Sequence, residues 1–180
     1  MRPAYAGIHS GVLTERKALP RAKEGAAMTT TTSLTREAID HIVEDHFRRE
    51  ADGDVEGTLT TLTEDVVHDV VGDPAGVLHG RAQVGQRYGH LFSNVKGERA
   101  DVKHRLYGEN FVVDDKIWTA RVTGELMGIP GHGRRISIRI LHVFEFRDGL
   151  ISRENVWIDA GAAIAQLTSG PEDQPHTTQP

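Results

Sequence analysis

The spacing of apolar residues predicts helices in the first part of the chain and strands in the second. Across residues 33–51, Leu34, Ala38 and Ile42 recur every four positions while charged residues fill the other face, which is typical of an amphipathic helix. The helix is expected to end at Gly53, because glycine is the residue most often found just past a helix end.

Two more helices and a strand are predicted in the segment that follows. Asp54 is a suitable cap for a short second helix, and residues 66–71 form a short apolar strand after it. Tyr88 lies at helical spacing from apolar neighbours and marks a third helix. Gly85 and Gly89 each destabilise this helix by about 1 kcal/mol.

Later segments are rich in β-branched and aromatic residues and are separated by turns. The predicted strands cover residues 102–107, 111–113, 117–127, 136–147 and 150–159, and a last short helix covers 160–167. Helices followed by a long antiparallel sheet are typical of the α+β class. We therefore predict a strongly curved antiparallel sheet that folds over three N-terminal helices and encloses a pocket.

The two ends of the chain differ in composition from its middle. Residues 1–32 hold no sustained apolar run, and Met28 followed by four threonines reads like a natural start, so we expect a disordered arm or an extended reading frame. Residues 170–180 contain three prolines and little to bury, which predicts a disordered tail. One folded domain is expected over residues 33–169.

Composition excludes several classes of function. The chain has no cysteine, which excludes disulfides, thiolate metal ligands and cysteine nucleophiles. Its 21 Lys and Arg against 26 Asp and Glu give a net charge of −5, so no nucleic-acid partner is expected. No apolar run approaches the roughly 20 residues of a membrane span, and no secretory signal is visible. We expect a cytoplasmic protein without a membrane partner.

The last predicted hairpin carries the first sign of a site. The Asp-Gly pair at 148–149 is typical of a two-residue type I′ turn, which fixes how the flanking strands pair. This register places His142 opposite Asn155. It puts Asp159 and Trp157 farther along the same face, which is otherwise apolar.

Asp159 is the candidate base on this face. Burial disfavours the charged form of a carboxyl group, so the pKa of Asp159 is expected to rise towards the range useful for proton transfer. Asp159 also stands where a strand passes into a helix, so it could simply cap that helix. His142 and Asn155 could stabilise charge on a ligand or form a satisfied buried pair. Because Asp159 lies about 13 Å along the strand from the level of His142, the two could act only on different parts of one ligand.

Several segments of the second half resemble one family. They are the Gly-Glu-Leu-Met-Gly-Ile-Pro-Gly-His-Gly-Arg-Arg run at 124–135, the Phe-Arg-Asp-Gly-Leu-Ile run at 146–151, and Asp159 followed seven residues later by Gln166-Leu167. Together they resemble the SnoaL-like polyketide cyclases, which belong to the fold group of nuclear transport factor 2 and ketosteroid isomerase. The resemblance covers nearly all of residues 33–169.

The resemblance implies a cone of curved sheet wrapped by helices, a homodimer or higher homo-oligomer, and chemistry that needs no metal or organic cofactor. Cyclases of this family use an Asp on the last strand to remove an acidic proton next to a carbonyl, and by position this role falls on Asp159. The chain departs from the family at residues 120–123, where relatives often show Gly-Thr, and at Asn155, where they often have Trp. Its substrate can therefore differ from the aromatic polyketides.

Six residues are candidates for contact with a substrate: Tyr88, Trp157, His68, His104, Trp118 and Arg121. A Tyr hydroxyl can polarise a carbonyl, although the spacing of Tyr88 also fits a core residue. His68, His104 and His142 could form a metal site, but the metal-ligand spacings are missing and the chain has ten histidines, so no metal is expected. His46 and the other helical histidines are expected on solvated faces.

We therefore expect a SnoaL-like enzyme that abstracts a proton α to a carbonyl, leading to cyclisation or isomerisation of a hydrophobic, polyketide- or steroid-like substrate. Asp159 would be the base, and Asn155, His142 or Tyr88 would stabilise the enolate. One alternative is epoxide hydrolase or dehydratase chemistry on the same fold, for which Arg121 and Asp159 supply two of three required groups. The other is a non-catalytic ligand-binding or dimerisation module, in which Asp159 caps the last helix and side chains fill the pocket.

Overall fold

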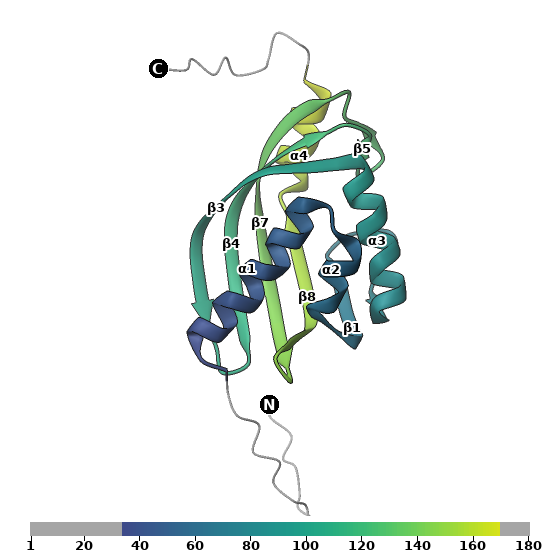
Figure 1. The fold of residues 1–180 in the computed structure, drawn as a ribbon. Helices are drawn as coiled ribbons and strands as arrows, with labels where there is room; N and C mark the ends of the chain where they lie inside the picture. Colours follow the sequence, from purple (N-terminus) through teal and green to yellow (C-terminus); the bar gives the residue numbers. More distant parts are fainter. Residues whose placement is uncertain (1–33, 170–180) are drawn as a thin grey trace, which may run out of the picture. The chain divides into compact units, whose positions relative to one another are not determined.

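Three helices cover one face of a curved sheet (Figure 1). The computed structural model describes residues 34–169, so the predictions for residues 1–32 and 170–180 lie outside the described part. The helices are α1 (Arg36–Asp52), α2 (Val55–Thr60) and α3 (Gly80–Asn94), and α4 (Ala160–Thr168) follows the last strand. The prediction of an α+β fold is confirmed.

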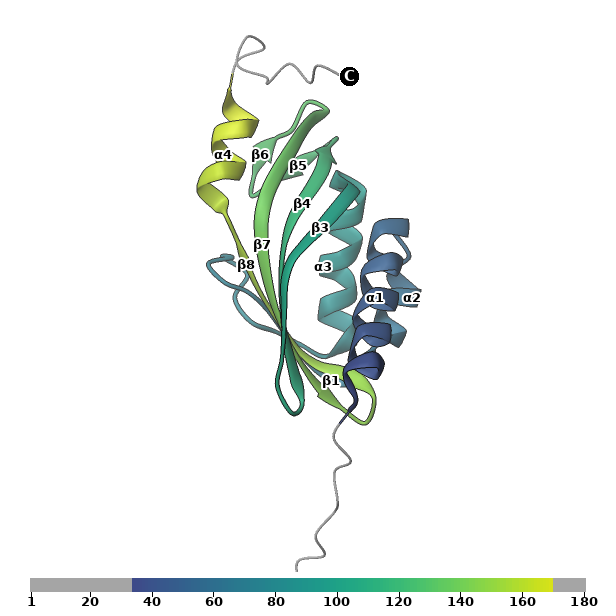
Figure 2. The ribbon, with the colours of Figure 1, turned by 90° about the vertical axis from the view of Figure 1, so that its left-hand side faces the viewer.

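The main sheet has six strands in the order β2-β1-β8-β7-β4-β3. They are β1 (Leu62–Val70), β2 (Leu78–His79), β3 (Val95–Tyr107), β4 (Phe111–Val122), β7 (Arg134–Arg147) and β8 (Leu150–Ile158), and a separate ladder joins β5 (Glu125–Leu126) to β6 (Ile129–Pro130). All pairings in the main sheet are antiparallel except that of β1 with β8, which is parallel and was not predicted. Figure 2 shows the predicted curvature of the sheet around α1, α2 and α3.

Helix α1 forms where its sequence pattern predicts it. The Thr35 hydroxyl caps it by accepting a hydrogen bond of 3.2 Å from the backbone N–H of Ala38. Gly53 ends the helix with a φ of 72°, a left-handed conformation that costs glycine little. The buried stripe of the helix contains Ile39 and Val43, which pack against the sheet and fix the position of α1 over it.

Strand β4 is continuous where the sequence predicted a break. The predicted strands 111–113 and 117–127 leave out Asp114, Asp115 and Lys116, and this break is wrong. All three are buried, and arginine partners compensate the charges of Asp114 and Asp115. Arg105 donates to Asp114 over 2.7 Å, and Arg139 donates to Asp115 over 2.6 Å. Lys116 points to the same face of the sheet as Asp114, towards the helices.

The hairpin between β7 and β8 begins as predicted and then departs from the predicted register. Both residues of the turn at 148–149 have positive φ, as a type I′ turn requires, and the first two pairs after it match the prediction. Ser152 is then an extra residue on β8 that has no partner residue on β7, which makes a β-bulge. Beyond it His142 lies opposite Val156, so the predicted pairing with Asn155 is wrong.

The bulge exchanges the two faces of β8, because side chains alternate along a strand. Glu154 and Val156 point towards the helices, and Glu154 is only 1% exposed. Asn155 and Trp157 point away from them, and Trp157 is 41% exposed. The acid that enters the interior is therefore Glu154, which the predicted register, with Asn155 inward, would have turned to the opposite face.

Two glycines of α3 offer a test of how this helix packs. A methyl group at Gly89 would meet nothing within 4 Å, so Gly89→Ala is expected to raise the free energy of unfolding by about 1 kcal/mol. A methyl group at Gly85 would lie 3.0 Å from Leu59, so Gly85→Ala is the matched control with a smaller gain. Urea unfolding of both variants measures the difference. A larger gain at Gly85 would contradict this packing of α2 against α3.

Candidate functional site

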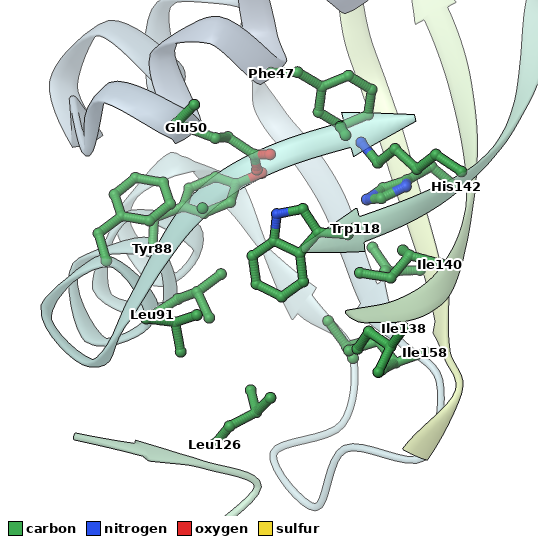
Figure 3. Close-up of a pocket in the computed structure, with 18 of the residues that line it drawn as sticks. Phe47, Glu50, Tyr88, Leu91, Trp118, Leu126, Ile138, Ile140, His142 and Ile158 are labelled. Atoms are coloured by element: carbon green, nitrogen blue, oxygen red, sulfur yellow. The ribbon is translucent and has the colours of Figure 1, made fainter. Parts of the chain in front are cut away.

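A pocket of about 330 Å³ lies between the helices and the concave face of the sheet. Its two ends differ in character, as Figure 3 shows. The aliphatic end is lined by Leu91, Val95, Leu126, Ile138, Ile140, Val156 and Ile158. The polar end is lined by Glu50, His68, Tyr88, Lys116, His142 and Glu154, and Trp118 also belongs to the lining. Such a pocket suits a mostly apolar ligand that carries one polar group.

Glu154 is the centre of the polar end. The Tyr88 hydroxyl donates to its Oε2 over 2.7 Å, and Nε2 of both His46 and His68 lies 3.6 Å from the same oxygen. Nε2 of His142 lies 3.8 Å from Oε1. Burial raises the pKa of the Glu154 carboxyl, but the charge of His68 and the hydrogen bond and charge of His46 outweigh it. The net pKa is well below its ordinary value, so Glu154 is ionised.

The hydrogen bonds around His46 define its protonation state. The Thr61 hydroxyl donates its one hydrogen to the carbonyl of Thr58, so it can only accept from Nδ1 of His46, 2.7 Å away. The Tyr88 hydroxyl has given its hydrogen to Glu154, so it accepts from Nε2 of His46 at 3.3 Å. Both ring nitrogens therefore carry hydrogen, and His46 is an imidazolium cation.

The pKa of His46 agrees with this assignment. Burial lowers the pKa of the imidazole, but the charge of Glu50 and the hydrogen bond to Glu154 raise it by a larger amount. The net pKa is about 9. Oε1 of Glu50 lies 3.5 Å from Nε2 of His46, and the His46 side chain is completely buried. The cation is thus held between two carboxylates, one behind the pocket wall and one facing the cavity.

His142 is neutral. Burial and the neighbouring Lys116 charge hold the pKa of the imidazole well below its ordinary value. Within residues 34–169 its Nδ1 has no hydrogen-bond partner, although the atom is buried. Phe47 and Phe144 pack on the ring, at centroid distances of 5.0 and 5.4 Å. His142 therefore forms a rigid part of the pocket wall. Its Nδ1 atom makes no hydrogen bond with the part of the chain that the structure describes.

Lys116 brings an ammonium group into the pocket wall. The residue is 4% exposed, and its Nζ lies 2.9 Å from the centroid of the Phe47 ring. Oδ2 of Asp114 is 3.9 Å away, too far for a hydrogen bond. Burial lowers the pKa of the ammonium to about 8, although the charges of Glu50 and Asp114 raise it in part.

Among the carboxylates that line the pocket, Glu50 is the one that a ligand in the cavity can contact. Its side chain is 21% exposed, and it points into the pocket beside Tyr88 (Figure 3). Glu154 is enclosed by its partners, and Glu98, at the rim, is held by Arg121 and Arg135. Among the three acids of the lining, Glu50 therefore combines access to a ligand with a cationic neighbour.

Four of the residues predicted from the sequence line the pocket, and five do not. Those in the lining are His142, Tyr88, His68 and Trp118, which come from four different elements of the fold. Those elsewhere are Asp159, Asn155, Trp157, His104 and Arg121. Their placement on the pocket wall was wrong, for reasons that differ from one residue to the next.

Asp159 lies at the end of β8, where it is exposed and caps α4. Its Oδ1 accepts a hydrogen bond of 3.0 Å from the backbone N–H of Ala162. The predicted apolar setting depended on the register that the bulge at Ser152 overturns, and the same shift sends Asn155 and Trp157 to the outer face. Of the two interpretations of Asp159, the structure shows the cap.

Arg121 and His104 lie outside the pocket for a simpler reason, because both side chains are exposed. Arg121 donates to Glu98 over 3.1 Å and to the carbonyl of Gly133 over 3.0 Å, so it is part of a surface pair. His104 lies opposite Asp115 on the outer side of the sheet. The three histidines His68, His104 and His142 therefore do not share one site.

Sequence reasoning missed three residues of the polar end, Glu50, Lys116 and Glu154, and also His46 behind them. For His46 a signal was present, because it follows Ile39 and Val43 at helical spacing on the buried face. The expectation of a solvated His46 is wrong. No signal in the hairpin sequence announces the bulge that turns Glu154 inward.

One group of side chains has ligand atoms close enough together to share a cation. The nitrogen of His46 and the oxygens of Glu50 and Glu154 lie within 4.8 Å of one another. A metal ion would need the Nε2 lone pair of His46, whereas the hydrogen bonds here place a hydrogen on that nitrogen. The arrangement fits a proton held between carboxylates better than a metal ion.

The curved sheet with helices over its concave face is a fold of the nuclear transport factor 2 type. The sequence matches the family model of the SnoaL-like domain over residues 43–154. The chain therefore belongs to the SnoaL-like family, and the resemblance seen in its sequence is confirmed. A comparison with curated proteins found no significant match.

Solved structures share the fold at low sequence identity. A proposed polyketide cyclase from Xanthomonas campestris is 20% identical, with a TM-score of 0.64 over 74% of this chain and 98% of its own. A proposed SnoaL-like polyketide cyclase from Jannaschia is 17% identical, with a TM-score of 0.65 over 82% and 100%. An epoxide hydrolase of the LEH-like type from M. tuberculosis is 19% identical, with a TM-score of 0.59 over 74% and 90%.

None of the helices described between residues 34 and 169 has the length and apolarity needed to cross a membrane. This agrees with the hydropathy of the sequence, in which polar residues interrupt every helical segment.

The His46 cation predicts how stability depends on pH. Its pKa rises from 6.5 to about 9 on folding, so its contribution is complete below pH 6.5 and is lost as the pH rises through about 9. Between pH 6.5 and 8, the wild type is expected to lose on the order of 1 to 2 kcal/mol more stability than His46→Gln. Urea unfolding across this range gives the measurement. Parallel curves for the two proteins would show that His46 is not charged.

Proposed function

We propose that the protein is an enzyme that removes a proton next to a carbonyl group of a hydrophobic small molecule. The observation that carries this proposal is that a reachable carboxylate, Glu50, and a buried ammonium, Lys116, both line the polar end of a pocket whose other end is aliphatic. Proton abstraction α to a carbonyl requires a base and a positive group for the oxygen that becomes negative. Glu50 and Lys116 supply these two groups at the polar end of the pocket.

Glu50 takes the role that the family assigns to an Asp on the last strand. Its carboxylate accepts the α-proton, and the His46 imidazolium behind it stabilises the bound carboxylate in its working position. Lys116 supplies positive charge at the carbonyl oxygen, where negative charge develops. Phe47 and the aliphatic end give these charges an apolar surrounding, which strengthens their effect on a bound substrate.

The remaining polar residues of the lining hold the site together. Glu154 and Tyr88 fix the His46 cation, while His68 and His142 enclose the Glu154 carboxylate on its other sides. A pocket of about 330 Å³ is at the lower end of the usual range for small ligands, which favours a compact substrate. Cyclisation or isomerisation of such a compound follows from the enolate.

The two alternatives are less well supported. Arg121, which epoxide hydrolysis would need in the pocket, is exposed. Arg105 does lie between Asp40 and Asp114, but none of these three lines the pocket. The non-catalytic alternative correctly expects Asp159 to cap α4, yet it also expects side chains to fill the pocket, and the pocket is open.

Hydrogen–deuterium exchange of a ketone tests the base. A phenyl-substituted cyclohexanone incubated with the protein in D₂O is expected to exchange its α-protons faster than in buffer, as NMR would show. Glu50→Gln removes the proton acceptor and keeps the shape, so exchange should fall on the order of 10²-fold or more.

Asp159→Asn is the matched control, because Asn caps a helix as well as Asp does. This variant should retain the wild-type exchange rate. Loss of exchange in Asp159→Asn together with normal exchange in Glu50→Gln would overturn the assignment of the base and restore Asp159. Glu37→Gln, on the exposed start of the same helix, controls for loss of negative charge on α1.

We also propose that the protein is a homodimer that pairs through the outer face of its sheet. Leu106, Val113 and Val143 lie side by side across β3, β4 and β7, and Leu141 lies opposite Trp157 beside them. Together these five residues form the outer apolar face. Leu106 is 62% exposed and Trp157 is 41% exposed, an area of apolar surface that a second copy would cover.

Light scattering at micromolar concentration is expected to report about twice the monomer mass. Leu106→Glu places a charge on the outer apolar face and should shift the protein to the monomer, while Gln86→Glu on the exposed side of α3 should not. A wild-type protein that is monomeric at micromolar concentrations would refute the proposed dimer.

A further inference from the structure

Lys116 differs from the other lysines that the structure describes. Lys96 and Lys103 lie on β3 with exposed side chains, so water solvates both. Lys116 is 4% exposed, and its amine meets the Phe47 ring on one side and the cavity on the other. The carboxylate oxygen nearest to its Nζ is that of Asp114, at 3.9 Å, which leaves the amine without a hydrogen-bonded carboxylate.

Burying a charged amine costs stability, and a stable protein usually offsets this cost with close ion pairs. Arg105 takes that place instead, because it holds Asp114 at 2.7 Å and Asp40 at 2.7 Å. Lys116 therefore stands at a pocket wall with its amine uncommitted. A buried amine in an apolar pocket is the usual setting of a lysine that attacks a carbonyl carbon.

We propose that Lys116 forms a covalent imine with the carbonyl group of the substrate, which is therefore an aldehyde or a ketone. The proposal rests on the proposed function, because it names the way in which Lys116 activates the carbonyl. Nζ bonds to the carbonyl carbon, the carbonyl oxygen leaves as water with two hydrogens of the ammonium group, and the product is an iminium ion. The positive charge is conserved, and no oxidant or reductant is needed.

The surroundings of Lys116 suit this step. At a pKa of about 8, roughly a tenth of the amine is unprotonated at pH 7, far more than for a solvated lysine. The iminium carbon withdraws electrons from the neighbouring C–H bond, so the Glu50 carboxylate across the polar end can take that proton and leave an enamine. Addition of water and a proton reverses the sequence and frees the lysine.

Reductive trapping tests the imine directly and requires no turnover. The full chain is incubated with a phenyl-substituted cyclohexanone and cyanoborohydride, which reduces an iminium to a stable secondary amine. Peptide mass spectrometry is expected to find the probe's mass less one oxygen atom on Lys116, at least tenfold above Lys96 and Lys103. The corresponding alcohol, which has no carbonyl, should label nothing.

Two variants complete the experiment. Lys116→Arg keeps a positive charge without a nucleophilic amine, and Lys116→Met removes the buried charge and should fold at least as well as the wild type. Both should lose the label and slow the α-proton exchange more than tenfold, while Lys103→Arg, on the surface of β3, should change neither. Circular dichroism melts confirm that the variants are folded.

The outcomes separate this inference from the proposed function. Equal labelling of Lys96, Lys103 and Lys116, or none, together with normal exchange in Lys116→Arg, would overturn the imine and leave the proton-abstraction enzyme standing. Labelling of Lys116 without any exchange by the wild type would support the imine and refute the proposed function. Labelling that is lost in both Lys116 variants together with the exchange supports both.

Discussion

The burial of one carboxylate, Glu154, is the constraint on which the rest of the site depends. An ionised acid that is 1% exposed is stable only if cations and hydrogen-bond donors surround it. The Tyr88 hydroxyl of α3 donates a hydrogen bond to it, and the imidazoles of His46 on α1, His68 on β1 and His142 on β7 surround it at 3.6 to 3.8 Å. Each of these elements is therefore held at the polar end of the pocket by the same negative charge, and the helices are fixed over the sheet by polar as well as apolar contacts.

The same constraint explains why a second charge of each sign appears at the cavity. The His46 cation needs more than one carboxylate, and Glu50 supplies the second from the next turn of α1. Among the neighbouring charges, that of Glu50 raises the pKa of the Lys116 ammonium most. A chain of alternating charges thus runs from the protein interior to the pocket, and its two outermost members are the ones that a ligand can meet.

The fold could be predicted from the sequence because its signals are local. Helix α1 follows from spacing and caps, and the hairpin turn follows from two residues with positive φ. The site could not be predicted as well, because it depends on pairings between distant residues. Arg105 and Asp114 make a buried charged stretch of strand possible, and neither residue alone announces the other.

The motif that the chain shares with its family reflects how α4 is attached to the sheet more than which residues line the pocket. The spacing from Asp159 to Gln166 marks how α4 is attached. Asp159 caps the helix, and Gln166 exchanges two hydrogen bonds, of 2.8 and 3.0 Å, with the backbone of Ser137 on β7. Leu167 is buried behind it. A motif can therefore identify the family correctly and still direct attention to a residue outside the pocket.

The bulge at Ser152 has a consequence for how such pockets change. Removing one residue at this position would leave the turn and the length of the sheet nearly intact, yet it would replace Glu154, Val156 and Ile158 at the pocket by their neighbours on the outer face. A single-codon insertion or deletion could thus exchange, in one step, all the side chains that one strand presents to a binding site. In a family with one frame and many chemistries, such a step offers a route between activities that substitutions alone would reach slowly.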